Sequence, residues 1–307
     1  MERRKFLKSA ALAGGATLTG LGLSNLEAQD VKPSNAAKFK LKYAPGLTAF
    51  SDLVGSRDLI DNIKFIADQG FTAVFDNGFP GKDPATQEKI MNELKRLGMD
   101  FGPYVLYADF GTESMVIKNE EKRTMLIETV KRGVEIGKRT GAKQALMVPG
   151  KYNQRLSWDY QTANVIDCMR ELSAIAEEGG MMIVLEPLNP YNHPGLFLKG
   201  IPQSYMICRA VNSPACKIVN DLYHQQISEG NLIPNLEMAW SEIGAMHCGD
   251  NPGRREPGSG EINFRNIFKF LHERKYNSTI CMEHGVSKGG KEGAQLLIDA
   301  YRMADNF

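Results

Sequence analysis

Short apolar runs alternate with longer amphipathic runs over most of the chain. The apolar runs, which are typical of buried β-strands, cover residues 39–43, 71–75, 101–106, 144–148, 181–185, 217–220, 244–248 and 278–282. The amphipathic runs, with apolar residues at helical spacing, cover 57–69, 84–97, 114–139, 159–178, 202–211, 231–240, 264–274 and 292–303. Glycines that stop a helix well follow several of these runs, at Gly70, Gly98, Gly141 and Gly179. The alternation predicts a parallel α/β sheet.

Eight strand–helix units in succession favour one closed (β/α)8 barrel, the TIM barrel. About 275 of the 307 residues follow the amino-terminal segment, which is near the ~250 residues of a typical barrel. An open doubly wound sheet would alternate in the same way, but no GxGxxG motif follows the first predicted strand. No charge run or Pro/Ser-rich linker divides the chain, so we predict a single domain over residues 31–307.

The first 30 residues have a different pattern. Arg3 and Arg4 precede a weakly apolar stretch rich in Ala, Gly and Leu, which ends in a polar segment. This order is similar to a twin-arginine export signal, with Glu2 where Ser or Thr is usual. We therefore predict a signal peptide over residues 1–30 and a periplasmic protein; the alternative is a cytoplasmic protein with a basic amino terminus. The apolar stretch is too short and weak to favour a stable membrane anchor.

Four successive predicted strands end on an acidic or histidine side chain. These residues are Glu186 after IVL, Asp221 closing KIVND, His247 in AMHC and Glu283 after ICM. In a (β/α)8 barrel, the carboxyl ends of all strands meet on one face, where active sites are built. Carboxylates with an imidazole suit Mn²⁺ or Mg²⁺, and also Co²⁺ or Zn²⁺, and the absence of a thiolate argues against a structural zinc site. The alternative is a set of polar groups that line the barrel mouth.

Two glutamates beside a divalent metal ion suggest proton transfer next to a carbonyl group. A carboxylate can act as the base and then as the acid, depending on its pKa. A metal ion on the substrate oxygens would stabilise an enediolate. Carboxylates on opposite sides suit epimerisation, whereas one carboxylate can do most of the work in a 1,2-shift. We predict that Glu186 and Glu283 are the catalytic pair.

Several polar residues near these strand ends are candidates for substrate binding. His224 lies three residues past Asp221, and we expect it to reach a substrate oxygen from a loop after the sixth strand. His193, in YNHPG, either contacts substrate or shapes its turn. Arg254 and Glu256, in NPGRREPGSGE, are candidates to bind a carboxylate or distal hydroxyl groups, because arginine binds carboxylates through two hydrogen bonds. The alternatives are a structural role for His224 and solvated loop charges.

Four stretches, LEPLNPYNHPGLFL, VNDLYHQQISEGNL, GAMHCGDNPGRREPGSGEINF and CMEHG, resemble the hydroxypyruvate isomerases. These enzymes belong to the xylose-isomerase-like (β/α)8 superfamily of sugar isomerases and epimerases, and the resemblance covers residues 183–285. It implies that the four strand-end residues hold the metal ion, that the two glutamates are the acid/base pair, and that His224 and Arg254 contact substrate. Histidine at position 247 is instead similar to the ketose 3-epimerases of the superfamily, since hydroxypyruvate isomerases often have glutamine there.

The sequence therefore predicts a metal-dependent isomerase or epimerase of a small carbohydrate or keto-acid, for which the resemblance allows a homodimer. A lyase that eliminates a β-leaving group from 3-keto-glycosides would use the same site. A metal-dependent endonuclease of the superfamily would need more histidine ligands and a basic face, whereas this chain has five histidines and a net charge of +1. The same charge argues against membrane-surface binding. A sugar-binding protein would be expected to have lost a metal ligand, and none is missing.

Overall fold

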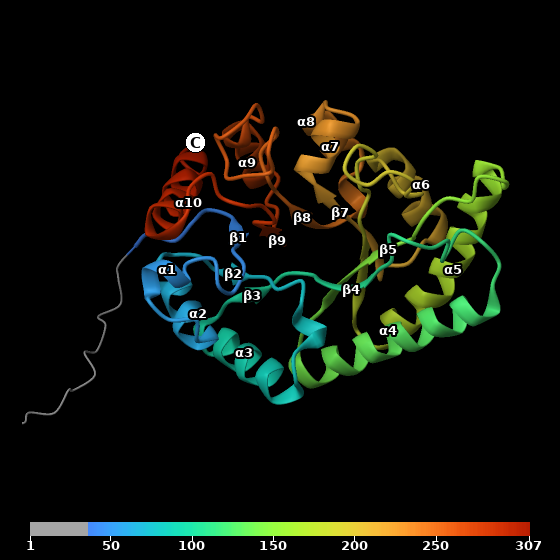
Figure 1. Ribbon diagram of the computed structural model, residues 1–307, viewed down its shortest axis with the longest axis horizontal. Coiled ribbons are helices and arrows are strands. Elements are labelled where there is room, and N and C mark those ends of the chain that lie inside the picture. The colour runs from blue at the N-terminus through green and yellow to red at the C-terminus, as the bar shows by residue number, and fades with distance from the viewer. Residues whose placement is uncertain (1–35) are drawn as a thin grey trace, which may run out of the picture. The chain divides into compact units, whose positions relative to one another are not determined.

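The computed structural model describes residues 36–307, which form a curled parallel sheet with helices around it (Figure 1). The strands are β1 (Lys42–Ala44), β2 (Ala73–Val74), β3 (Asp100–Phe101), β4 (Tyr104–Ala108), β5 (Gln144–Val148), β6 (Met182–Leu185), β7 (Cys216–Asp221), β8 (Ile243–His247) and β9 (Thr279–Cys281). The α-helices are α1 (Ser51–Val54), α2 (Leu59–Asp68), α3 (Pro84–Leu97), α4 (Glu120–Thr140), α5 (Trp158–Glu178), α6 (Ile201–Val211), α7 (Leu222–Ser228), α8 (Leu232–Met238), α9 (Phe264–Glu273) and α10 (Gly290–Ala304). Two short 3₁₀ helices are η1 (Phe79–Gly81) and η2 (Trp240–Glu242).

The sheet closes on itself. Seven strands pair in the order β1-β9-β8-β7-β6-β5-β4, and β2 pairs with β3. A parallel bridge between Gly46 and Phe75, with the Phe75 amide donating to the Pro45 carbonyl at 3.1 Å, joins β1 to β2. β3 and β4 are two parts of one strand, which is interrupted at Gly102–Pro103 because proline has no amide hydrogen to donate. With β3 and β4 counted as one strand, the sheet is an eight-stranded barrel, which confirms the predicted (β/α)8 fold.

Helices cover the barrel because each has one apolar face. In α9 the buried residues are Phe264, Ile267, Phe268 and Leu271, spaced three or four residues apart. The ring of Phe268 is fully buried, and its centroid lies 4.8 Å from that of Tyr43 on β1. α9 is thereby packed onto the strand that closes the barrel.

Phe268→Ala is expected to lower the free energy of unfolding by about 3–5 kcal/mol, because it removes a fully buried ring and leaves a cavity between α9 and β1. The midpoint of urea unfolding, followed by circular dichroism, would measure this loss. Met303→Ala, at a side chain that is 75% exposed on α10, is the control and should change the midpoint little. A midpoint for Phe268→Ala equal to that of the control would contradict the packing.

The helix after β4 begins later than predicted. The pattern predicts a helix from residue 114, but α4 begins at Glu120 because the side chain of Asn119 accepts from the Lys122 amide at 2.9 Å and caps it. The residues before this cap form a loop instead, in which the Met115 amide donates to the Pro149 carbonyl.

The segment after β7 also differs from the prediction. The pattern predicts a loop after the sixth strand and one helix over 231–240, but the structure has two helices, α7 and α8. Asp221 caps α7, because its Oδ1 accepts from the Tyr223 amide at 2.8 Å. The predicted loop position of His224 is therefore wrong, since this residue lies on α7.

The predicted export signal, residues 1–30, lies outside the described residues, so the signal and the periplasmic location stay predictions. Within residues 36–307, no helix is both long enough and apolar enough to cross a membrane.

Candidate active site

Four side chains converge at the carboxyl end of the barrel. Glu186, Asp221, His247 and Glu283 each offer one ligand atom, and these atoms lie within 4.8 Å of one another. They follow or end the four neighbouring strands β6, β7, β8 and β9 (Figure 1). Neighbouring parallel strands end at the same edge of the sheet, so residues far apart in sequence become neighbours there. Below, these four residues are called the strand-end cluster.

Positive groups bridge the carboxylates of the strand-end cluster. Nδ1 of the fully buried His247 lies 3.0 Å from Glu283 Oε2 and 3.2 Å from Glu186 Oε1. Nη2 of Arg254, from the loop after β8, donates to Asp221 Oδ2 and to Glu283 Oε2, both at 2.6 Å. The structure thus brings the predicted substrate ligand Arg254 into direct contact with two of the predicted metal ligands.

The two glutamates have opposite pKa shifts. Burial, followed by the nearby charge of Glu283, raises the pKa of Glu186 to about 7. Burial also acts to raise the pKa of Glu283, but the positive charges of His247 and Arg254 outweigh it and lower that pKa. A pair of carboxyl groups with separated pKa values can contain one proton donor and one base at neutral pH.

The strand-end cluster fits a divalent cation. Its donors are three carboxylates and one imidazole, a set that binds ions such as Mn²⁺, Mg²⁺, Co²⁺ or Zn²⁺. His247 Nε2 is buried and has no hydrogen-bond partner among residues 36–307, and Glu186 Oε1 has only its ionic contact with His247 Nδ1 there. A buried polar atom without a partner is costly, and a bound cation would satisfy it. The identity of the ion stays a prediction.

His224 and His193 lie side by side next to this cluster. The amide nitrogen Nδ2 of Asn189 is 2.6 Å from His224 Nδ1, which makes Nδ1 the acceptor and assigns the hydrogen to Nε2. That Nε2 lies 3.6 Å from Asp221 Oδ2 and has no hydrogen-bond partner in the described part of the chain. Burial lowers the pKa of His224 to about 4, so the ring is a neutral donor. The His193 ring packs 5.3 Å from the His224 ring.

Glu256 lies elsewhere. Its carboxylate accepts from the amide and the hydroxyl of Ser287, in the segment before α10, and the residue is buried. This contact ties the loop after β8 to the segment after β9. Both oxygens of Glu256 therefore have local partners, and its predicted role as a substrate ligand stays a prediction.

Asp250 is a residue that the sequence analysis missed. It is fully buried, and its two oxygens accept four backbone N–H groups of its own loop at 2.9–3.0 Å. The donors are Asn251, Gly258, Gly260 and Ile262. The Asp250 amide also donates to the Arg255 carbonyl at 2.7 Å. An aspartate ahead of a glycine-rich stretch signals such a turn, but the sequence does not show which amides it binds.

This loop places Arg254. The backbone of Arg254 has φ +51°, a left-handed conformation that is uncommon for residues other than glycine. Its carbonyl accepts from the Gly285 amide at 3.0 Å, and its guanidinium lies 5.1 Å from the Tyr223 ring. Asn77, three residues after β2, was also missed as a site residue; its side-chain amide donates to Glu283 Oε1. The rule that found the other four residues does not find it, because Asn77 is an amide that lies two residues past the predicted strand end at residue 75.

Comparisons with known proteins indicate the same fold. Residues 63–303 match the family model described as Xylose isomerase-like TIM barrel. A hydroxypyruvate isomerase of Escherichia coli (strain K12) is 28% identical over 173 residues, which cover 56% of this chain and 67% of that protein. A 3-dehydro-D-guloside 4-epimerase of the same organism is 29% identical over 193 residues, covering 60% and 70%. For several other curated relatives, the chain spans about half of their length.

A solved structure shares the fold. The 3-keto-D-glucoside 4-epimerase from E. coli superposes with a TM-score of 0.69 at 21% identity, over 87% of this chain and 100% of that one. Because the family model matches most of its length, this chain belongs to the xylose isomerase-like TIM barrel family.

Proposed function

We propose that this protein is a metal-dependent isomerase or epimerase that moves a proton beside the carbonyl group of a small sugar or hydroxy-keto acid. One observation carries the proposal: Glu186 and Glu283 both face the same buried imidazole, at 3.2 and 3.0 Å, in a cluster whose donor set fits a divalent cation. The curated relatives include isomerases and epimerases, which supports the reaction class.

The side chains have complementary roles in this proposal. Glu283, held ionised by its positive neighbours, removes a proton from the carbon next to the carbonyl group. Glu186, on the other side of His247, returns a proton. Return to the neighbouring carbon, together with transfer of the hydroxyl proton to the former carbonyl oxygen, isomerises the substrate, and return to the opposite face of the same carbon epimerises it. Proton exchange with solvent then restores the ionised Glu283 and the protonated Glu186. In this proposal the guanidinium of Arg254 and the Nε2 of His224, which both lie next to Asp221, bind substrate oxygens.

The four residues of the strand-end cluster would hold the metal ion. When bound, a divalent cation would supply Lewis-acid stabilisation of the negative charge that develops on substrate oxygens.

β-Elimination from a 3-keto-glycoside is the second candidate. Its basis is that two similar proteins carry names that refer to 3-keto-sugar glycosides, a guloside and a glucoside. The same base would remove the same kind of proton, and a leaving group in the β position would then depart. The products distinguish the two reactions, since elimination releases the leaving group and epimerisation does not.

The test is deuterium uptake from D₂O, followed by NMR, with hydroxypyruvate, keto sugars and 3-keto-glycosides as substrates. With Mn²⁺ we expect exchange at the carbon next to the carbonyl group. Chelation should slow this exchange by about a hundredfold or more, and added Mn²⁺ should restore it, because the charge on the substrate oxygens loses its counter-ion. Exchange that persists at full rate in chelated protein would contradict the metal requirement, and no exchange with any of these substrates would contradict the proposed reaction.

A further inference from the structure

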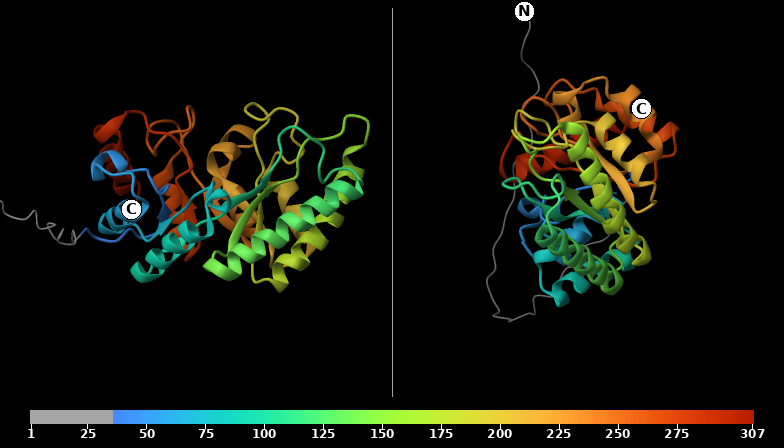
Figure 2. Two further views of the ribbon diagram at one scale, coloured as in Figure 1. Left: turned by 60° about the horizontal axis from the view of Figure 1, so that its bottom comes forward. Right: turned by 90° about the vertical axis from the view of Figure 1, so that its right-hand side faces the viewer.

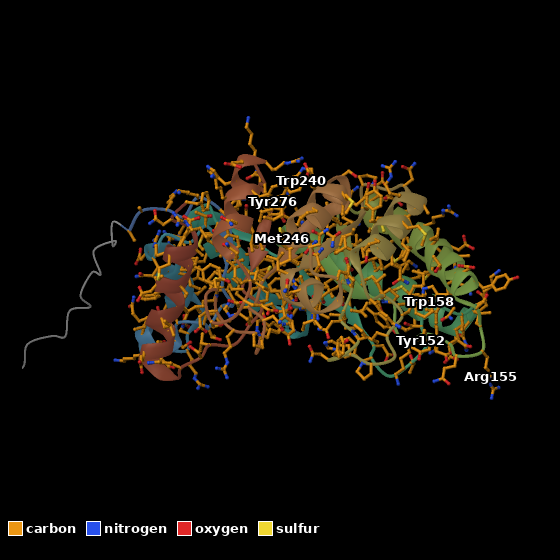
Figure 3. All side chains as sticks on the ribbon, turned by 90° about the horizontal axis from the view of Figure 1, so that it is seen from above. Tyr152, Arg155, Trp158, Trp240, Met246 and Tyr276 are labelled. Atoms are coloured by element: carbon orange, nitrogen blue, oxygen red, sulfur yellow. The ribbon has the colours of Figure 1, made fainter. Side chains whose placement is uncertain are left out.

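Exposed aromatic side chains occur in the segments that follow three consecutive strands, β4, β5 and β6. Within residues 36–307, the exposed aromatic side chains are Phe110, Trp158, Tyr160 and Tyr191. All four lie in the loops after β4 and β6 or in the first turn of α5. Figure 3 shows Tyr152 and Trp158 beside each other, away from Trp240 and Tyr276. These loops lie at the carboxyl end of the barrel strands, the face where binding sites of this fold are built.

The loops that carry these rings are joined into one fixed layer. Antiparallel bridges link Glu113 to Gly150 and Lys151 to Leu196, so the loop after β5 lies between those after β4 and β6. Figure 2 shows the three loops together on one side of the barrel. Backbone hydrogen bonds hold them before any ligand arrives, so a surface on this layer is preformed.

Phe110 is the exposed ring that connects to the strand-end cluster. It is 49% exposed, and its ring lies 5.2 Å from that of His193. His193 in turn packs against His224, whose Nε2 lies 3.6 Å from Asp221. Asp109 fixes the turn under Phe110, because its Oδ1 accepts the amides of the two residues that follow Phe110 at 2.7 and 3.0 Å.

We propose that Phe110 and His193 form a subsite for a second ring, and that the substrate is a glycoside of two rings. The reacting keto-sugar ring would lie at the strand-end cluster, and the apolar face of the next ring would stack on Phe110. This inference rests on the proposed function and adds the size and class of the substrate.

Two further features favour a sugar ring as the occupant. A keto acid of three carbons at the strand-end cluster would leave the Phe110 ring uncovered, whereas a second ring would cover it. Polar groups for ring hydroxyls adjoin the aromatic face: Oδ1 of the exposed Asn192 accepts from Tyr223 and Asn189, which leaves its Nδ2 as a donor. His193 adds an imidazole. An apolar ring face next to hydrogen-bonding groups matches the amphipathic surface of a pyranose.

The test compares binding of a ligand with one ring and a ligand with two rings. Full-length protein loaded with Mn²⁺, in the Glu283→Gln background so that turnover does not interfere, is titrated with methyl 3-keto-glucoside and with 3-keto-cellobiose. Phe110→Ala should weaken binding of the disaccharide by about three- to tenfold, which corresponds to one lost ring stack, and leave the methyl glycoside almost unchanged. Phe110→Tyr keeps an aromatic ring and should therefore bind the disaccharide about as tightly as the protein with Phe110. Tyr160→Ala, which removes another exposed ring, is the matched control and should affect neither ligand.

Each outcome decides between the claims. Equal weakening of both ligands, no weakening, or no binding of the disaccharide would overturn the subsite. A Phe110→Ala variant that instead changes the sedimentation mass would show that a second copy of this chain covers the ring. Disaccharide binding through Phe110 without deuterium exchange in the wild-type protein would refute the proposed function and leave the subsite standing. Deuterium exchange with hydroxypyruvate alone, at a rate that Phe110→Ala does not change, would support the proposed function and refute the subsite.

Discussion

Glu283→Gln is expected to slow deuterium exchange and turnover by about a thousandfold, because an amide cannot accept the proton that an ionised carboxylate removes. Glu186→Gln should slow them by about a hundredfold or more, since an amide cannot donate the proton that this carboxyl group is proposed to return. Both effects should persist across neutral pH, because glutamine does not titrate.

Loss of the metal ion would mimic these effects, so rates are compared at saturating Mn²⁺, with binding followed by electron paramagnetic resonance. The matched control is Glu242→Gln. Glu242 is another buried glutamate; it lies just before β8, pairs with Lys217 at 2.7 Å, and is neither a proposed metal ligand nor a proposed substrate ligand. Its rate should stay within about twofold of wild type. A Glu283→Gln protein that binds Mn²⁺ and exchanges within about tenfold of the wild-type rate would remove Glu283 from the acid/base pair.

The strand-end cluster was visible in the sequence because of the periodicity of the fold. An apolar run of four or five residues, such as that before Glu186, predicts a buried parallel strand and also where it ends. Since all strands of a barrel point the same way, their carboxyl ends share one face, and His247 and Glu283 could be placed together although 35 residues separate them. Their roles stay predictions, because position alone does not assign chemistry.

The loops were not predictable in the same way. Asp250 contacts amides up to twelve residues away, and these contacts follow from the path of an irregular loop that has no repeating pattern. Glu256 shows the same limit: its charge made it a candidate substrate ligand, but the sequence does not show that its carboxylate accepts from Ser287. The start of α7 was missed because Asp221 has two roles, as a strand-end carboxylate and as a helix cap, and only the first was recognised.

Asp250→Asn is expected to lower kcat/KM by about tenfold or more, because the loop that Asp250 holds would no longer position the guanidinium of Arg254. Each oxygen of Asp250 accepts two backbone amides, so the NH₂ group of asparagine would face two donors and the loop would have to shift. The free energy of unfolding should fall by about 2–4 kcal/mol for the same reason. The loss of activity should lie mainly in KM, because the proposed role of Arg254 is to bind substrate oxygens.

A double-mutant cycle separates positioning from general damage. Arg254→Ala should lower kcat/KM by about a hundredfold, and adding Asp250→Asn to it should cost little more, because the group that Asp250 positions is already gone. Asp305→Asn is the control: this buried aspartate binds the Lys40 amide and the Tyr43 hydroxyl after α10, so its loss should reduce stability but leave kcat/KM unchanged. If Asp250→Asn lowers kcat/KM by the same factor with and without Arg254, the loop does not act through the guanidinium, and Asp250 is a stabilising residue only.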